Sequence, residues 1–166
     1  MKRRAGLTLT LGIVATAVLL HGCAPAYQRT YDEKTQQLEA RERANQELEA
    51  QAHAQAQKYA AVVNFTMGKA DLDADGQREL RWFVQQMQPY PQAMFDVQGF
   101  ADSTGSEAKN AGLSQQRAEA VADYLASQGI DASRMVTKGF GTASPAASNV
   151  TSQGRRNNRR VEVTVR

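Results

Sequence analysis

Histidine and cysteine are scarce in this chain of 166 residues, which contains two histidines and one cysteine. Imidazole and thiolate groups supply most zinc ligands and many activated nucleophiles, so little material is present for a zinc site or for nucleophilic catalysis. We therefore expect a protein that is not an enzyme and that needs no metal and no cofactor.

A long apolar run is missing as well. Lys2, Arg3 and Arg4 form a basic start, and the apolar run from about Leu7 to Leu20 is shorter than the roughly 20 residues of a membrane-spanning helix. A basic start followed by a short apolar run and small residues is typical of a secretory signal. We expect residues 1–22 to be a signal peptide, with an uncleaved membrane anchor as the alternative.

The single cysteine, Cys23, directly follows Leu20-His21-Gly22. A lone cysteine in an exported protein cannot form a disulfide within its own chain, so it needs another explanation. This segment resembles a bacterial lipobox, which implies that Cys23 carries acyl chains such as palmitate as the first mature residue. Ala24 in place of an aspartate implies the outer membrane. A free thiol or an intermolecular disulfide is the alternative.

An excess of charge is missing from the mature chain. The sequence has 20 basic and 17 acidic residues, but residues 1–22 hold three of the basic residues and no acid. The remainder has 17 of each and lacks the basic surface expected for nucleic-acid binding. A basic cluster near the C-terminus has no interleaved aromatic residues, and we expect it to anchor a loop or to contact carboxylates: Arg155, Arg156, Arg159 and Arg160.

Residues 23–58 are rich in Ala, Gln, Glu and Arg, which favour a helix, and contain no glycine and only one proline, Pro25. Large apolar residues are too sparse for a continuous heptad seam. We expect a solvated, helical spacer, reaching roughly 45–50 Å if fully helical. A dimeric coiled coil is the alternative.

Residues 59–166 alternate between strand and helix patterns, which predicts one α/β domain with a sheet of about four strands and two main helices packed on it. The expected strands are 59–65, 95–100, 134–140 and 160–165, and the expected helices are 75–88 and 106–127. Asp75 is the expected cap of the first helix and Gly129 the cap that follows the second. The acidic segment 71–76 resembles the start of a calcium loop, but Trp82 stands where such a loop needs a glutamate.

The helix at 106–127 places Arg117 in the middle of an apolar stripe when residues are spaced by about 100°. A partly buried arginine is costly without a partner, so it needs an acid or an anionic ligand. Asp102 follows the preceding strand and can reach the first turns of this helix, near Asn110. An acid, an amide and a guanidinium in one cleft suit a zwitterion, while a purely structural Asp–Arg pair is the alternative.

Several motifs carry a resemblance to a known family over about residues 62–166. They are Gly99-Phe100-Ala101-Asp102-x-x-Gly105, Asn110-x-x-Leu113-Ser114-x-x-Arg117-Ala118-x-x-Val121, Gly139-Phe140-Gly141 and Gly154-Arg155-x-x-Asn158-Arg159-Arg160-Val161-Glu162. This pattern closely resembles the OmpA C-terminal-like domain of peptidoglycan-associated lipoproteins. The resemblance implies an OmpA-like α/β sandwich that binds the diaminopimelate of peptidoglycan stem peptides.

Within that resemblance, Asp102 matches the aspartate that binds the ammonium group and Arg117 the arginine that binds the carboxylate, while Asn110 and Leu113 match residues that line the pocket. Two departures stand out. Phe100-Ala101 replaces the usual His-Thr, which removes a hydroxyl from the site, and Thr66 follows Phe65 where the family often has an acid.

These observations predict an outer-membrane lipoprotein whose periplasmic domain tethers the membrane to the cell wall by binding peptidoglycan. The alternative is an envelope adaptor that uses the same domain mainly to recruit other envelope proteins. A motor-stator protein would need a true membrane helix, and a wall hydrolase would need a nucleophile or metal site.

Overall fold

The computed structural model describes residues 24–166, so the predicted signal peptide and the predicted lipid site at Cys23 lie outside the described residues. The chain divides into two compact units, of which the first ends at Ala44 and the second is Asn45–Arg166. The predicted domain limits at 22/23 and 58/59 stay predictions.

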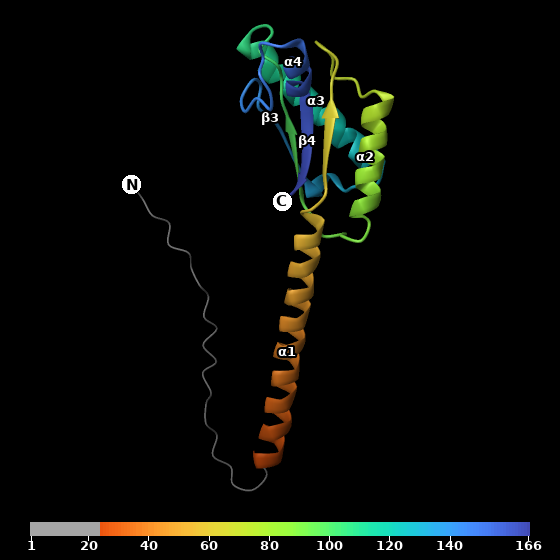
Figure 1. Ribbon diagram of the computed structural model, residues 1–166. Helices are drawn as coiled ribbons and strands as arrows, with labels where there is room; N and C mark the ends of the chain where they lie inside the picture. The colour runs from red at the N-terminus through yellow and green to blue at the C-terminus, as the bar shows by residue number, and fades with distance from the viewer. Residues whose placement is uncertain (1–23) are drawn as a thin grey trace, which may run out of the picture. The chain divides into compact units, whose positions relative to one another are not determined.

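Helix α1, Ala24–Ala56, occupies the segment where a helical spacer is expected (Figure 1). Its side chains from residue 27 to 55 are all exposed, as its composition predicts, and Ala56 is the first buried one. The last turns of the helix, from Asn45 onward, belong to the second unit. Within residues 24–166, no helix combines the length and the apolar character that crossing a bilayer requires.

The second unit contains the expected four-stranded sheet, formed by β1 (Ala60–Asn64), β2 (Phe95–Gly99), β3 (Met135–Gly139) and β4 (Arg160–Val165). The strand order is β1-β4-β2-β3, so the last strand of the chain lies between the first two. Strand β4 is antiparallel to β1 and β2, whereas β2 and β3 are parallel. The ends of β1, β2 and β3 and the start of β4 therefore meet at one end of the sheet.

Helices α2 (Ala74–Met87) and α3 (Glu107–Ser127) both pack on one face of this sheet (Figure 1). Alternate residues of the strands point into the layer between sheet and helices because side chains alternate along a strand. The largest fully buried apolar side chains of this core are Val63, Leu80, Phe83, Met87, Phe95, Val97, Val121, Leu125, Val161 and Val163.

Two local expectations are corrected by the structure. The side chain of Asp73, not that of Asp75, caps α2 by accepting a hydrogen bond from the backbone N–H of Gly76 at 2.8 Å, while Asp75 lies in the first turn of the helix. A short helix α4, Ser152–Asn158, stands in the region expected to be only a loop. It has no apolar stripe, so hydrophobic periodicity could not reveal it.

Helix α3 approaches the sheet unusually closely over two glycines at the strand ends. A Cβ atom at Gly99 would lie 2.0 Å from the backbone oxygen of Ser114, and one at Gly139 would lie 2.4 Å from the backbone nitrogen of Gln115. Backbone atoms cannot move away as a side chain can, so these positions admit only glycine. This contact determines how close the N-terminal half of α3 lies to the strand ends.

We predict that Gly99→Ala lowers the free energy of unfolding by about 1–3 kcal/mol, since the added methyl group overpacks a rigid contact. Gly112→Ala is the matched control, because Gly112 lies in α3 with nothing within 4 Å of its added Cβ atom. The control should gain up to about 1 kcal/mol from the higher helix propensity of alanine. Urea unfolding of both variants measures the difference, and equal stability would contradict the close approach.

Candidate functional site

A pocket of about 250 Å³ opens where the loops after β1 and β2 meet the first half of α3 and the residue before β4. The two loops and the residue before β4 converge there because β4 lies between β1 and β2 in the sheet. All four residues predicted for the site line this pocket. The lining is Met67, Gly68, Ala101, Asp102, Thr104, Gly105, Lys109, Asn110, Leu113, Arg117 and Arg159.

Asp102 lies in the loop after β2 and is only 4% exposed. One carboxylate oxygen, Oδ1, accepts the backbone N–H of Thr104 at 2.9 Å, and the other, Oδ2, accepts Nη1 of Arg159 at 2.8 Å. The backbone oxygen of Asp102 also accepts the side-chain amide of Asn110 at 3.1 Å. The carboxylate is thus held in one orientation from both sides.

The environment of Asp102 favours its ionised form. Burial acts to raise the pKa of this carboxyl, but the hydrogen bonds from Arg159 and Thr104 outweigh burial and hold the pKa below its ordinary value. Asp102 is therefore an anion at neutral pH. Its two oxygens have about four acceptor positions, of which these contacts use two, so the carboxylate can accept further donors.

Arg117 is completely buried, and its partners differ from the expected ones. Nε donates to the backbone oxygen of Lys69 at 2.8 Å, Nη1 to that of Phe100 at 3.2 Å and Nη2 to that of Thr66 at 3.1 Å. Within residues 24–166 no direct ion pair joins Arg117 to Asp102, although the charge of Asp102 is near enough to favour the protonated form of Arg117. Three carbonyl oxygens from two strand-end loops instead accept hydrogen bonds from three of the five N–H groups of the guanidinium.

The charge of Arg117 persists in this setting. Burial and the neighbouring charge of Arg159 lower the pKa of Arg117 to about 10, while the charge of Asp102 opposes this shift. The group is therefore protonated at neutral pH. Within residues 24–166 no carboxylate forms an ion pair with it, and the residue lines the pocket.

Asn110 and Leu113 lie on the same helix as Arg117 and line the same pocket. Asn110 is 5% exposed and fixes the Asp102 loop through its side-chain amide. Leu113 is half-buried and offers an apolar wall. The predicted residues therefore surround one pocket, with charged groups and an apolar surface in the same small space.

Arg159 is the site residue that the sequence reasoning did not select. Its Nε donates to the backbone oxygen of Phe65 at 2.9 Å while Nη1 binds Asp102, so it links the ends of β1 and β2. The sequence places it immediately before the last strand, in a cluster of four arginines. Only the insertion of β4 between β1 and β2 distinguishes it from the other three.

The two departures from the family pattern have different consequences. Phe100 stacks on Phe140 with ring centroids 5.5 Å apart, and the guanidinium of Arg160 lies 4.1 Å from the centroid of the Phe100 ring. This packing supports the backbone oxygen that Phe100 offers to Arg117. Thr66 contributes through its backbone oxygen, so the missing acid at this position does not remove its contact with Arg117.

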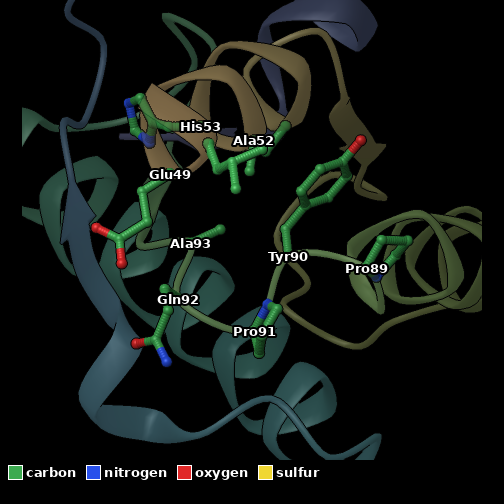
Figure 2. A pocket seen from close by; sticks show the side chains of 10 residues that line it. Glu49, Ala52, His53, Pro89, Tyr90, Pro91, Gln92 and Ala93 are labelled. Carbon is green, nitrogen blue, oxygen red and sulfur yellow. The ribbon is translucent and has the colours of Figure 1, made fainter. Parts of the chain in front are cut away.

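A second pocket, of about 280 Å³, lies between the C-terminal turns of α1 and the segment 89–93 (Figure 2). Pro89, Tyr90, Pro91 and Ala93 face Ala52 across it, and the lining is mostly apolar. It lacks the paired acid and guanidinium that the first pocket has. Residues 24–166 also contain no cluster of three or more His, Cys, Asp or Glu residues that could hold a metal ion.

Comparisons with known proteins agree with this architecture. The protein named "Probable lipoprotein YiaD" of Escherichia coli is 45% identical over 103 residues, which are 62% of this chain and 47% of that protein. "Peptidoglycan-binding protein ArfA" of Mycobacterium tuberculosis is 48% identical over 75 residues, 45% of this chain and 23% of that protein. The matched segments thus span less than half of either relative.

Among solved structures, the peptidoglycan-associated lipoprotein of Burkholderia pseudomallei superimposes with a TM-score of 0.61 and 26% identity, over 64% of this chain and 90% of that one. The domain is a binding domain rather than a catalyst, in keeping with these neighbours. The family model described as "OmpA family" matches residues 64–159, which contain every lining residue of the pocket formed by Asp102 and Arg117. The chain therefore belongs to the OmpA family.

Proposed function

We propose that this protein binds peptidoglycan through the zwitterionic end of a diaminopimelate residue in the stem peptide. The observation that carries the proposal is that Asp102 and Arg117, one anion and one cation, line a single pocket of about 250 Å³. Ligand pockets for drug-sized molecules start at roughly 300 Å³, so this one suits the end of one amino acid. The names of ArfA and of the Burkholderia lipoprotein support peptidoglycan as the ligand.

The two charged groups offer complementary contacts to such a ligand. Asp102 can accept hydrogen bonds from an ammonium group with its remaining lone pairs. Arg117 uses three of its five N–H groups for carbonyl oxygens, which leaves two for a carboxylate. In a pocket that is shielded from water, each contact is stronger than it would be at an open surface. Leu113 can pack against the aliphatic part of the residue.

Arg159 positions Asp102 in this proposal. A buried carboxylate without a partner would take up a proton, since burial raises its pKa, and a neutral acid attracts an ammonium group only weakly. The ion pair at 2.8 Å keeps the carboxylate charged and directed. Arg159 thus keeps the carboxylate of Asp102 charged and oriented for an ammonium group.

We further propose that the protein is lipidated at Cys23 and tethers the outer membrane to the wall. The lipobox-like Leu20-His21-Gly22-Cys23 supports this proposal, together with the lipoprotein names of two of the proteins compared. Release of the intact protein from outer-membrane fractions after Cys23→Ser substitution is the direct test.

One prediction concerns the opposite charges of Asp102 and Arg117. Asp102→Asn, which keeps the shape of the side chain, should weaken sedimentation of the full chain with isolated sacculi by roughly 10- to 100-fold in affinity. Arg117→Lys should act in the same direction, because lysine lacks the planar fork. Asp123→Asn, at an exposed carboxylate of the same helix, is the control and should bind normally. Unchanged sedimentation of folded Asp102→Asn would reject the site.

The second prediction concerns the wall itself. Sacculi that carry lysine in place of diaminopimelate lack the side-chain carboxylate that Arg117 would bind. The protein should sediment with such walls about tenfold less well than with diaminopimelate walls. Equal sedimentation with both walls would contradict recognition of the zwitterion, even if the protein binds peptidoglycan by another route.

The third prediction concerns Arg159. Because the folded pKa of Asp102 lies below its ordinary value of about 3.9, the ion pair stabilises the fold above about pH 4, and this stability is lost as pH falls through the lower folded pKa. Arg159→Met should therefore lower the free energy of unfolding at pH 7 by about 3 kcal/mol. The difference from the native protein should shrink towards pH 3. Urea unfolding at both pH values measures it.

The control for this experiment is Arg78→Met, which breaks an exposed ion pair with Asp75 at 2.5 Å. Exposed pairs contribute about 0–1 kcal/mol, so this variant should stay close to the native protein at every pH. A pH-independent loss in Arg159→Met would show that the loss comes from packing rather than from the ionisation of Asp102.

A further inference from the structure

The pocket has more positive charge than its proposed zwitterionic ligand needs. The described residues that line it include three cations, Lys109, Arg117 and Arg159, and a single carboxylate, Asp102. Arg159 and Asp102 neutralise each other in their ion pair. The charges of Lys109 and Arg117 remain. A zwitterion has no net charge, so a neutral ligand would leave this excess uncompensated.

Lys109 occupies a position that helix stability does not explain. It is the third residue of α3, after the cap Ser106, whose side-chain oxygen accepts the backbone N–H of Lys109 at 3.4 Å. The N-terminus of a helix carries positive partial charge, which favours an acid there and disfavours a cation. A glutamate or glutamine at this position would complete a capping box with Ser106. Lysine therefore stands where the helix favours the opposite charge.

The side chain of Lys109 lies at the open rim of the pocket. Lys109 is exposed, and within residues 24–166 its ammonium group makes no ion pair with a carboxylate. Its backbone is fixed by the cap, whereas no hydrogen bond or ion pair of its side chain is present in the part of the chain that the structure describes. An ammonium group in this place can reach a ligand that extends out of the pocket.

We infer that Lys109 binds a second carboxylate of the stem peptide, next to the diaminopimelate end held by Asp102 and Arg117. The pocket then selects stem peptides whose carboxylates are free over those in which they are amidated. This inference rests on the proposed function. Two carboxylates have the required chemistry: the α-carboxylate of the glutamate that precedes diaminopimelate, and the carboxylate that ends the peptide.

The test measures binding of the full chain to the tripeptide L-Ala-γ-D-Glu-diaminopimelate by calorimetry. Two further peptides carry an amide at either the glutamate α-carboxylate or the carboxyl end. For the native protein, amidation of the carboxylate that Lys109 binds should weaken binding about threefold to fivefold. The peptide that shows the loss identifies which of the two carboxylates Lys109 contacts.

Lys109→Gln should bind the free tripeptide about threefold to fivefold less tightly than the native protein and should no longer distinguish it from the amidated peptides. Lys138→Gln removes an exposed lysine that is not among the lining residues and should behave as the native protein. Equal affinity of the native protein for all three peptides, or the same discrimination by Lys109→Gln, overturns the inference.

Failure of the inference and failure of the proposed function give different results. If all three peptides bind the native protein equally and Asp102→Asn abolishes this binding, the result supports the diaminopimelate site and rejects the role of Lys109. If the native protein binds none of the peptides, the proposed function and the inference fall together.

Discussion

The complete burial of the Arg117 guanidinium is the constraint on which the site depends. A buried cation without hydrogen-bond partners would be very costly, so the surrounding backbone must supply acceptors. It does so from two places, with carbonyl oxygens of Thr66 and Lys69 after β1 and of Phe100 after β2. The same three contacts therefore hold two loops against α3. Stability and site geometry are coupled here, because the group that fixes the loops also lines the pocket.

Two arginines, Arg159 and Arg117, have the two roles that the sequence analysis expected of Arg117 alone. Arg159 pairs with Asp102 and bonds to the end of β1, so it keeps the carboxylate ionised and oriented. Arg117 forms no ion pair within residues 24–166 and stays protonated at neutral pH, so in the proposed function its charge serves the ligand. A direct Asp102–Arg117 pair would have neutralised both groups and left little for a zwitterion to bind. The separation of the two roles is what makes the proposed recognition physically reasonable.

The close packing of α3 against the strand ends positions the helix that carries Asn110, Leu113 and Arg117 into the site. Gly99 and Gly139 let the helix backbone approach the strand ends to a distance that no side chain would permit. The pocket beside this helix has a volume of about 250 Å³, which in the proposed function holds one end of a single amino acid. In that proposal the rest of a polymeric ligand lies outside the pocket, past the exposed side chain of Lys109. In the proposed function Asp102 and Arg117 bind the diaminopimelate residue, and Lys109 at the rim contacts a carboxylate next to it.

The sequence by itself determined the α/β class, the four strands, the two main helices and the grouping of Asp102, Asn110, Leu113 and Arg117 in one pocket. The class and the elements follow from local periodicity, which depends on neighbours along the chain, whereas the grouping that includes Leu113 was implied by the resemblance to the OmpA-like domain. The tertiary structure alone decided the partners of the two arginines. Placing β4 between β1 and β2 brings Arg159 to Asp102, 57 positions away in the chain, and brings three carbonyl oxygens to Arg117. Strand order is a long-range property, and no periodicity within a segment encodes it. Helix α4 and the capping role of Asp73 were not predicted from the sequence because both are local features that are too short to leave a repeating pattern.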